Sequence, residues 1–163
     1  MRDTLLSILI YFYLNGSKSS AIDSIAVLPF QNTSGDPNNE YLSDGVTETT
    51  INSLSRIGPL GVMARSTMFR FKGRESDPRT VGRELGVQAV MTGRILQRGD
   101  DLTISVEVVN VADGTQLWGQ QYKRPVAQLA NVQQEIASDI TAGLRLKLTE
   151  DPHSIEPRWQ PRL

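Results

Sequence analysis

The sequence predicts a single α/β domain with a mixed sheet of about five strands, in the order β-α-β-α-β-β-β-α, covered by helices. Three observations support this fold class. Short apolar runs alternate with helical patterns in the first half of the chain, which is typical of parallel strands joined by helices. The hydrophobic period then changes to two between Val87 and Lys123, which indicates a three-stranded antiparallel meander. A long amphipathic pattern after Pro125 predicts a covering helix.

The first strand and helix are predicted from two adjacent signals. Residues 25–30 read IAVLPF, a run typical of a short strand buried on both faces. Asp36-Pro37 has the form of a helix start, because Asp accepts from the first free N–H groups and Pro lacks one. Gly45, inside the helix, predicts close backbone packing or a bend. The helix is expected to reach Ile57 with an apolar face of Leu42, Val46, Thr50, Leu54 and Ile57.

A second strand and a second helix are expected next. The apolar run at 60–65 predicts a strand parallel to the first one. After a basic and aromatic connection at 66–73, Asp77-Pro78 starts a short helix that Gly86 ends in the left-handed conformation.

The meander and the last helix follow from the positions of their apolar residues. Trp118 and Tyr122 share one face of the third meander strand, and we expect them to contact the last helix. The predicted inward residues are Val87, Ala89, Met91, Gly93 and Ile95 in the first strand, and Leu102, Ile104, Val106 and Val108 in the second. The helix stripe is Leu129, Val132, Ile136, Ile140, Leu144 and Leu148.

The composition excludes several classes of function. A chain of 163 residues with a formal charge of −1 fits one ordinary domain and has no global field that would attract nucleic acid. It contains no cysteine, so disulfides, thiolate catalysis and cysteine-bound metals are excluded. The single histidine, His153, lies in a proline-rich tail, which argues against a histidine triad or metal centre. We expect no cofactor.

The amino-terminal apolar segment has three open interpretations. The stretch between Thr4 and Leu14 would cover about half of a membrane's hydrocarbon core. It fits the outer end of a membrane anchor, the core of a signal peptide, or a soluble arm. The expected organisation is this apolar segment at 1–16, a linker at 17–24, the α/β domain at 25–148 and a disordered tail at 149–163.

No motif in the chain predicts catalysis. The phosphate-binding patterns GxxxxGK[ST] and GxGxxG are absent, and so is the GxSxG nucleophile elbow. The loop from Asn32 to Glu40 is rich in oxygen ligands, but Tyr41 stands where a calcium loop needs glycine. Capping of the next helix explains the same residues, so no metal is expected. Asp44 and Glu48 lie one helical turn apart and are interpreted as a solvated face, with a shared-proton pair as the enzymatic alternative.

A basic and aromatic segment runs from Arg65 to Arg74 and includes Phe69 and Phe71. Three interpretations are open: aromatic rings that fill the core beside solvated cations, a single-strand nucleic-acid surface, or an anionic ligand held by Arg65. A small-ligand site is expected at the rim that this segment shares with the first strand and helix. Its candidate residues are Asn32, Ser34, Asp44, Arg65 and Ser66.

Five stretches of the chain resemble the TolB-like amino-terminal domain of bacterial membrane receptors. They are IAVLPF, NTSGDPNNEYLSDGVTETTINSLSRI, ARSTMFRFKG, GRELGVQAVMTGRI and DGTQLWGQQYKR. That domain is attached to serine/threonine kinases, adenylate cyclases and winged-helix regulators, often with tetratricopeptide repeats. The resemblance covers residues 25–148 and implies an α/β module outside the cytoplasmic membrane, with no catalytic residues and a role in interaction or sensing.

The expected function is therefore a non-enzymatic, extracytoplasmic interaction or sensing domain of a bacterial signalling protein, tethered to the inner membrane. It would bind a protein partner, such as a receptor subunit, or a small ligand. The alternative is a cytoplasmic single-strand nucleic-acid-binding module that uses Arg65–Arg74. A free strand edge favours a homodimer or a partner strand. The chain is expected to be a receptor fragment, a split gene product or a standalone anchored relative.

Overall fold

The computed structural model describes residues 5–8, 10 and 22–148. Of the apolar segment, residues 5–8 and 10 are helical and exposed, with Leu5 and Leu6 among the most exposed apolar side chains described. Most of the predicted linker and all of the predicted tail at 149–163 lie outside the described residues. No helix within the described ranges combines the length and the apolar character that a membrane crossing requires.

A six-stranded mixed sheet forms the centre of the domain, as the predicted fold class requires. The strands follow the order β3-β1-β4-β5-β6, and the short β2 also pairs with β4. β1 is parallel to β3 and β4, whereas β4, β5 and β6 form the predicted antiparallel meander. The strand bounds are Ser24–Val27 for β1, Gln31–Asn32 for β2, Gly61–Val62 for β3, Ala89–Arg98 for β4, Asp101–Asn110 for β5 and Gln116–Pro125 for β6.

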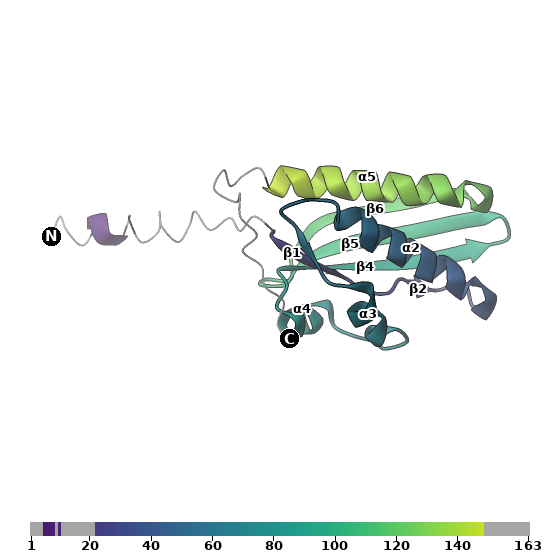
Figure 1. Ribbon diagram of the computed structural model, residues 1–163, viewed down its shortest axis with the longest axis horizontal. Helices are drawn as coiled ribbons and strands as arrows, with labels where there is room; N and C mark the ends of the chain where they lie inside the picture. Colours follow the sequence, from purple (N-terminus) through teal and green to yellow (C-terminus); the bar gives the residue numbers. More distant parts are fainter. Residues whose placement is uncertain (1–4, 9, 11–21, 149–163) are drawn as a thin grey trace.

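The helices form a layer on each side of the sheet, and the two layers are unequal. α2 and α5 lie side by side over one face, and the shorter α3 and α4 lie on the opposite side (Figure 1). The described helices are η1 at Pro37–Asn39, α2 at Glu40–Leu54, α3 at Arg65–Met68, η2 at Phe69–Phe71, α4 at Pro78–Leu85, η3 at Val126–Gln128 and α5 at Leu129–Leu148.

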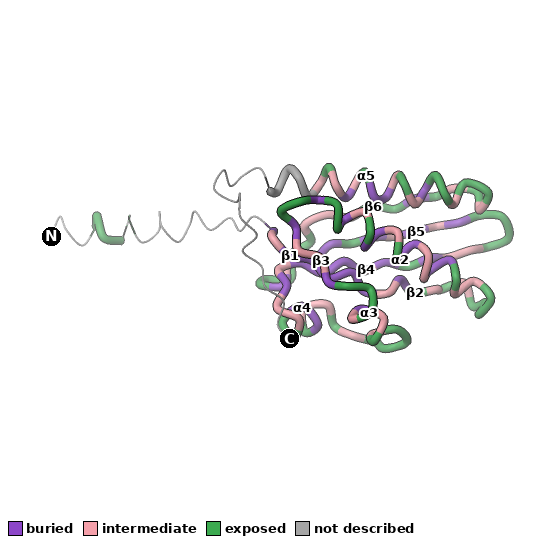
Figure 2. The backbone as a smooth tube through the Cα atoms, in the orientation of Figure 1, coloured by how far each residue is buried: buried purple, intermediate pink, exposed green. Residues whose placement is uncertain are grey.

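Each helix layer covers its own hydrophobic cluster, and the buried strands β1 and β4 run between them (Figure 2). The larger cluster lies under α2 and α5 and contains most of the predicted inward residues, Ile104 and Ile136 among them. Val87 was predicted on this face, and that prediction is wrong: it belongs to the smaller cluster. β4 begins only at Ala89, so strand alternation does not yet apply at Val87. The side chains of Leu144 and Leu148 are outside the described residues.

The predicted helix signals are confirmed at three positions. The Asp36 carboxylate accepts a hydrogen bond from the Asn38 N–H, and Asp77 accepts one from the Thr80 N–H. Gly86 ends α4 with a φ of 70°, the left-handed conformation that glycine adopts without steric cost. The first helix differs in detail, because it starts as the single 3₁₀ turn η1 before α2 begins at Glu40.

Gly45 is not needed for close packing, the first of its two predicted roles. A Cβ atom there would meet only Gln133 Nε2, at 3.7 Å. Gly45→Ala should therefore raise the free energy of unfolding by about 0.5–1 kcal/mol, because alanine loses less backbone entropy in a helix. Urea denaturation measures the change. Gly143→Ala, in α5, is the matched control: its Cβ would lie 2.9 Å from Trp118 Cδ1, so this variant should show no such gain. A loss of stability in Gly45→Ala would contradict the prediction.

The contact predicted between the third meander strand and the last helix is confirmed. Tyr122 is buried and its hydroxyl donates to Asp139 Oδ2 over 2.8 Å. Trp118 packs beside Gly143. Because only the short turn η3 separates α5 from β6, these contacts fold the helix back over the strand that precedes it.

Tyr122 should make stability depend on alkaline pH. Burial, and then the hydrogen bond to Asp139, raise the pKa of Tyr122 well above its ordinary value of 10.0. Above pH 10 the unfolded chain loses this proton before the folded chain does, so the free energy of unfolding falls as pH rises. Tyr122→Phe should lose less stability than the wild type between pH 8 and pH 11 in urea denaturation. The exposed Tyr41→Phe is the control, and equal slopes for all three proteins would contradict the assignment.

A bulge separates β1 from β2, where the sequence predicts one continuous strand. Val27 lies opposite Met91, and Gln31 lies opposite Arg94, so three residues on one strand face two on the other. Pro29 has no N–H for the ladder. The Phe30 N–H turns away from the sheet and donates to Thr47 Oγ1 on α2 over 2.9 Å. The bulge thereby ties the start of the sheet to α2 and shapes the surface described next.

Candidate functional site

A groove of about 680 Å³ lies beside the bulge, between the bulged strand and the loop that precedes α4. Its base includes Thr92, Gly93 and Arg94 of β4 together with Glu107, which is the cross-strand neighbour of Thr92. One wall is the segment 28–33, and the other is the loop 71–76 with Pro78. Glu40, at the start of α2, also lines the groove.

The chemistry of the groove is mixed. The part-exposed Pro29 and Phe71 contribute apolar surface beside the buried Leu28 and Phe30, and apolar surface suits pockets that bind organic ligands or side chains. The charged lining is balanced, with three carboxylates and three cations. These charged residues are Glu40, Glu75, Glu107, Lys72, Arg74 and Arg94. The groove therefore favours a partly apolar occupant over a highly charged one.

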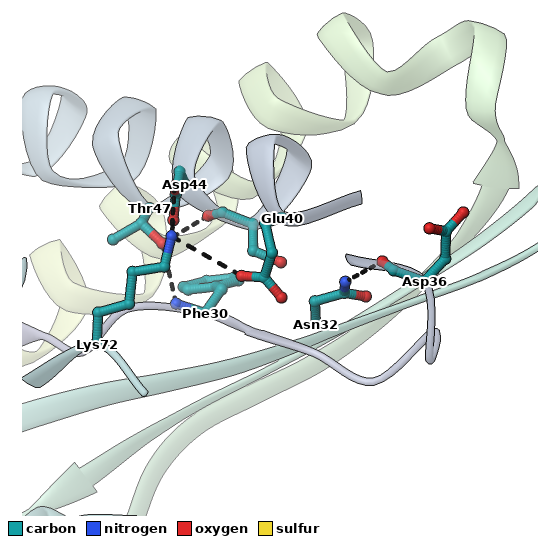
Figure 3. A network of polar contacts seen from close by, with 8 residues as sticks. Phe30, Asn32, Asp36, Glu40, Asp44, Thr47 and Lys72 are labelled. Carbon is teal, nitrogen blue, oxygen red and sulfur yellow. Dashed lines mark hydrogen bonds and ion pairs between the residues drawn. The ribbon is translucent and has the colours of Figure 1, made fainter. Parts of the chain in front are cut away.

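An acidic stripe on α2 holds the segment that forms the groove wall. Glu40, Asp44 and Glu48 are four residues apart and share one face of the helix. Lys72 Nζ lies 2.7 and 2.6 Å from the two carboxylate oxygens of Asp44 (Figure 3). It also lies 3.8 Å from Glu40 Oε2. These half-exposed pairs add at most about 1 kcal/mol each to stability, so their main effect is to position the loop.

Arg65 makes the second contact with the stripe. Its Nε lies 3.3 Å from Glu48 Oε2, and its guanidinium lies 4.3 Å from the centre of the Phe69 ring. Asp44 and Glu48 thus each face their own cation, which supports the solvated-face interpretation over a shared proton.

The five predicted site residues occupy different places. Asn32 lines the groove, where its side chain donates to the Asp36 carbonyl over 2.8 Å and accepts from the Ser34 N–H. Asp44 reaches the groove only through Lys72. Ser34 Oγ accepts from the Gln97 N–H over 2.8 Å, and Ser66 is exposed on α3. Ser34, Arg65 and Ser66 are outside the groove lining.

The groove includes Phe71, Lys72 and Arg74 of the predicted basic and aromatic segment, and the residues that the sequence did not suggest come from the polar face of the meander and from the end of the loop at 75–76. Strand alternation indicates that Thr92 and Arg94 point away from the larger core, so their orientation could have been predicted. The place of the loop 71–76 over this face could not be predicted, because the loop has no hydrophobic period that would show what it covers.

The basic and aromatic segment is used within the fold. Arg65 and Lys72 are paired with the acidic stripe, and Phe71 packs against the smaller cluster. These contacts support the interpretation that the rings fill the core, and they leave less cationic surface for nucleic acid. Among the described residues, no group of three or more His, Asp or Glu side chains is placed to hold a metal ion.

Comparison with known proteins gives a family match and a longer relative. Residues 20–139 match the family described as HilA/YgeH-like transcriptional regulator, second domain. The chain is 41% identical over 126 residues to "Putative adenylate cyclase 3" of Rhizobium meliloti (strain 1021). The match covers 77% of this chain and 22% of that relative. The chain thus spans about a fifth of the length of this relative.

Two solved structures share the fold at low sequence identity. TolB from Acinetobacter baumannii is 18% identical with a TM-score of 0.55, over 76% of this chain and 28% of TolB. Lipoprotein GNA1162 from Neisseria meningitidis is 17% identical with a TM-score of 0.54, over 73% of this chain and 96% of the lipoprotein. The similarity to TolB that the sequence suggested is therefore confirmed at the level of the fold.

Proposed function

The chain belongs to the family of the second domain of HilA/YgeH-like transcriptional regulators, and on this basis we propose that it is a non-catalytic interaction and sensing domain of a bacterial signalling protein. The observation that carries the proposal is that related domains occur in different kinds of larger protein. It matches one domain of a regulator family and about a fifth of a protein named as a cyclase. A module common to two such different proteins is best explained as an input or docking unit. This use agrees with the TolB-like receptor domain that the sequence resembles.

We assign ligand or partner binding to the groove. Its apolar surface and balanced charges suit a small organic ligand or a segment of a partner protein. Asn32 and Lys72 form part of its wall. Asp44 holds Lys72 in place, and Ser34 and Arg65 hold the segments around the groove, whereas Ser66 lies exposed beside Arg65.

Turnover assays test the non-catalytic part of the proposal. The full chain, incubated with ATP and either Mg²⁺ or Mn²⁺, should form no cyclic AMP, and it should not hydrolyse standard ester or phosphate substrates. Asp44→Asn and Glu48→Gln test the carboxylate pair that the sequence analysis names as the enzymatic alternative. A turnover that either substitution abolishes would contradict the proposal.

Binding to the groove can be tested with two matched arginine variants. Arg94 and Arg98 are both exposed on β4 and lie four residues apart on the same face, but only Arg94 lines the groove. Amide NMR spectra recorded with pools of amino acids, nucleotides and short peptides identify a binder and the residues it shifts. Arg94→Ala should weaken its affinity about tenfold or more, and Arg98→Ala should leave it unchanged. Shifts confined to residues far from the groove would refute this assignment.

The proposal also places the domain outside the cytoplasmic membrane, tethered through the apolar segment at 4–14. The name of lipoprotein GNA1162, a protein of the same fold, supports this location. Alkaline phosphatase fused after Leu163 should be active, because it matures only outside the cytoplasm, and the matching β-galactosidase fusion should be inactive. The reverse pattern would assign a cytoplasmic location.

A further inference from the structure

β6 is an edge strand, with no described strand paired to its outer side, and we propose that this edge pairs with the same edge of a second copy of the chain. The strand is ten residues long and lies at the end of the sheet, with β5 as its single neighbour among the described strands. An edge of this length exposes a row of backbone donors and acceptors that favours strand addition. The inference concerns assembly and is independent of the proposed function.

The register of the meander shows which backbone groups point outward. The Val126 N–H donates to the Asp100 carbonyl over 2.8 Å, which makes these two residues a hydrogen-bonded pair. Hydrogen-bonded and non-hydrogen-bonded pairs alternate along an antiparallel ladder. Counting back along the register, Trp118, Gln120, Tyr122 and Arg124 direct their backbone groups to β5. The residues between them, Gly119, Gln121 and Lys123, direct theirs away from the sheet.

These outward groups are self-complementary. In an antiparallel pair of β6 strands with the two-fold axis at Gln121, Gly119 faces Lys123 of the second copy and Gln121 faces its own counterpart. In all three facing pairs (Gly119 with Lys123, Gln121 with Gln121, and Lys123 with Gly119), both residues direct their backbone N–H and C=O groups toward the other copy. The two-fold contact uses the same patch on both chains, so it closes as a dimer. It requires only that Arg124 Nη1 give up its hydrogen bond to the Lys123 carbonyl.

The side chains agree with this register. On the open face of the sheet, Lys123 lies opposite Gly119 of the second copy, which has no side chain and no charge. On the α5 face, Arg124 lies opposite the indole of Trp118, a favourable partner for a guanidinium. No like charges are directly opposed across the pair, an arrangement that would be unfavourable.

Two features limit the pairing to the middle of β6. A bulge disturbs the strand where Trp118 pairs with Val108 and Gln116 with Val109. At the other end, Pro125 has no N–H to offer. The available stretch therefore runs from Trp118 to Arg124, and only the register centred on Gln121 pairs all three of its outward residues.

Charge substitution at the two-fold axis tests the proposal. Sedimentation analysis of the full chain over a range of concentrations should show a reversible monomer–dimer equilibrium. Gln121→Lys and Gln121→Glu each place two like charges against one another at the axis, so each variant alone should weaken dimerisation about tenfold or more. An equimolar mixture of the two should restore a dimer at least as stable as the wild type. Gln121→Ala removes the side chain without adding charge and should dimerise like the wild type.

Cysteine substitution gives a second, independent readout, because the chain has no cysteine of its own. Gln121→Cys should form a covalent dimer under mild oxidation, since facing residues of a hydrogen-bonded pair lie about 5.5 Å apart between Cα atoms. Ser105→Cys is the control: it is the neighbour of Gln121 on β5, one strand in from the edge, and should stay monomeric.

Three results would overturn the proposal: a wild type that stays monomeric at high concentration, a dimer unaffected by charge at Gln121, or equal crosslinking at both cysteine positions. A dimer that forms through the exposed apolar segment around Leu5 would be unaffected by charge at Gln121, which is the second of these results. Circular dichroism of each variant confirms that it is folded.

Discussion

Gly93→Ala should lower the free energy of unfolding by about 1–3 kcal/mol, which is the usual cost of forcing one extra carbon into a packed core. A Cβ atom at Gly93 would lie 2.4–2.6 Å from three carbons of the Phe30 ring, which is too close for any real contact. Phe30 is buried in the larger cluster and follows Pro29 directly, so its ring has little freedom to move. The substitution therefore acts on the bulge that shapes the groove.

A double-mutant cycle measured by urea denaturation isolates this contact. Phe30→Leu leaves room for the new methyl group, so Gly93→Ala should cost clearly less in that background than in the wild type. Gly58→Ala is the control for the exchange itself, because a Cβ there meets nothing within 4 Å. Equal costs of Gly93→Ala in the two backgrounds would show that the ring does not hold this position.

Thr47→Val should also cost about 1–3 kcal/mol, although the two side chains have nearly the same shape. The Thr47 hydroxyl is buried, accepts from the Phe30 N–H over 2.9 Å and donates to the Ser43 carbonyl over 2.7 Å. Valine leaves the Phe30 N–H buried without a partner, and a buried unpaired donor bears its full desolvation cost.

Thr50→Val is the matched control for this prediction. Thr50 is equally buried on α2, but its hydroxyl only donates to the Val46 carbonyl and accepts from no described backbone N–H. The loss of unfolding free energy in Thr50→Val should stay under about 1 kcal/mol. In thermal or urea denaturation, Thr47→Ser, which keeps the hydroxyl, should lose an amount between those of Thr50→Val and Thr47→Val. Equal losses at both positions would mean that the Phe30 N–H is satisfied in another way.

The parts of the fold that follow from local signals were predictable from the sequence. The caps at Asp36 and Asp77 and the end of α4 at Gly86 depend only on neighbouring residues. The meander and the stripe of α5 follow from hydrophobic period, and Leu102 to Val108 lie as that period predicts. These features need no knowledge of the rest of the chain, which explains why one sequence suffices to find them.

The features that the sequence did not predict depend on contacts between distant segments. The break after Val27 is stabilised by Thr47 and by the space above Gly93, and neither is adjacent to it in the chain. α3 and η2 lie where the sequence predicts a basic and aromatic connection without helix, because their stabilising partners, Glu48 among them, lie on α2. The groove has the same origin: Asn32 was a candidate from its position in the loop, whereas Arg94 lines it only because the loop 71–76 folds over β4.

The position of β1 has a mechanical consequence. β1 lies between β3 and β4 and is parallel to both, so a pull on the chain ahead of Ser24 acts along the strand and loads its hydrogen bonds with both neighbours at the same time. Bonds loaded together in shear resist force better than bonds opened one after another. In a tethered protein, tension on the segment before Ser24 would therefore be carried into the most buried strand of the domain and from there to the bulge and the groove.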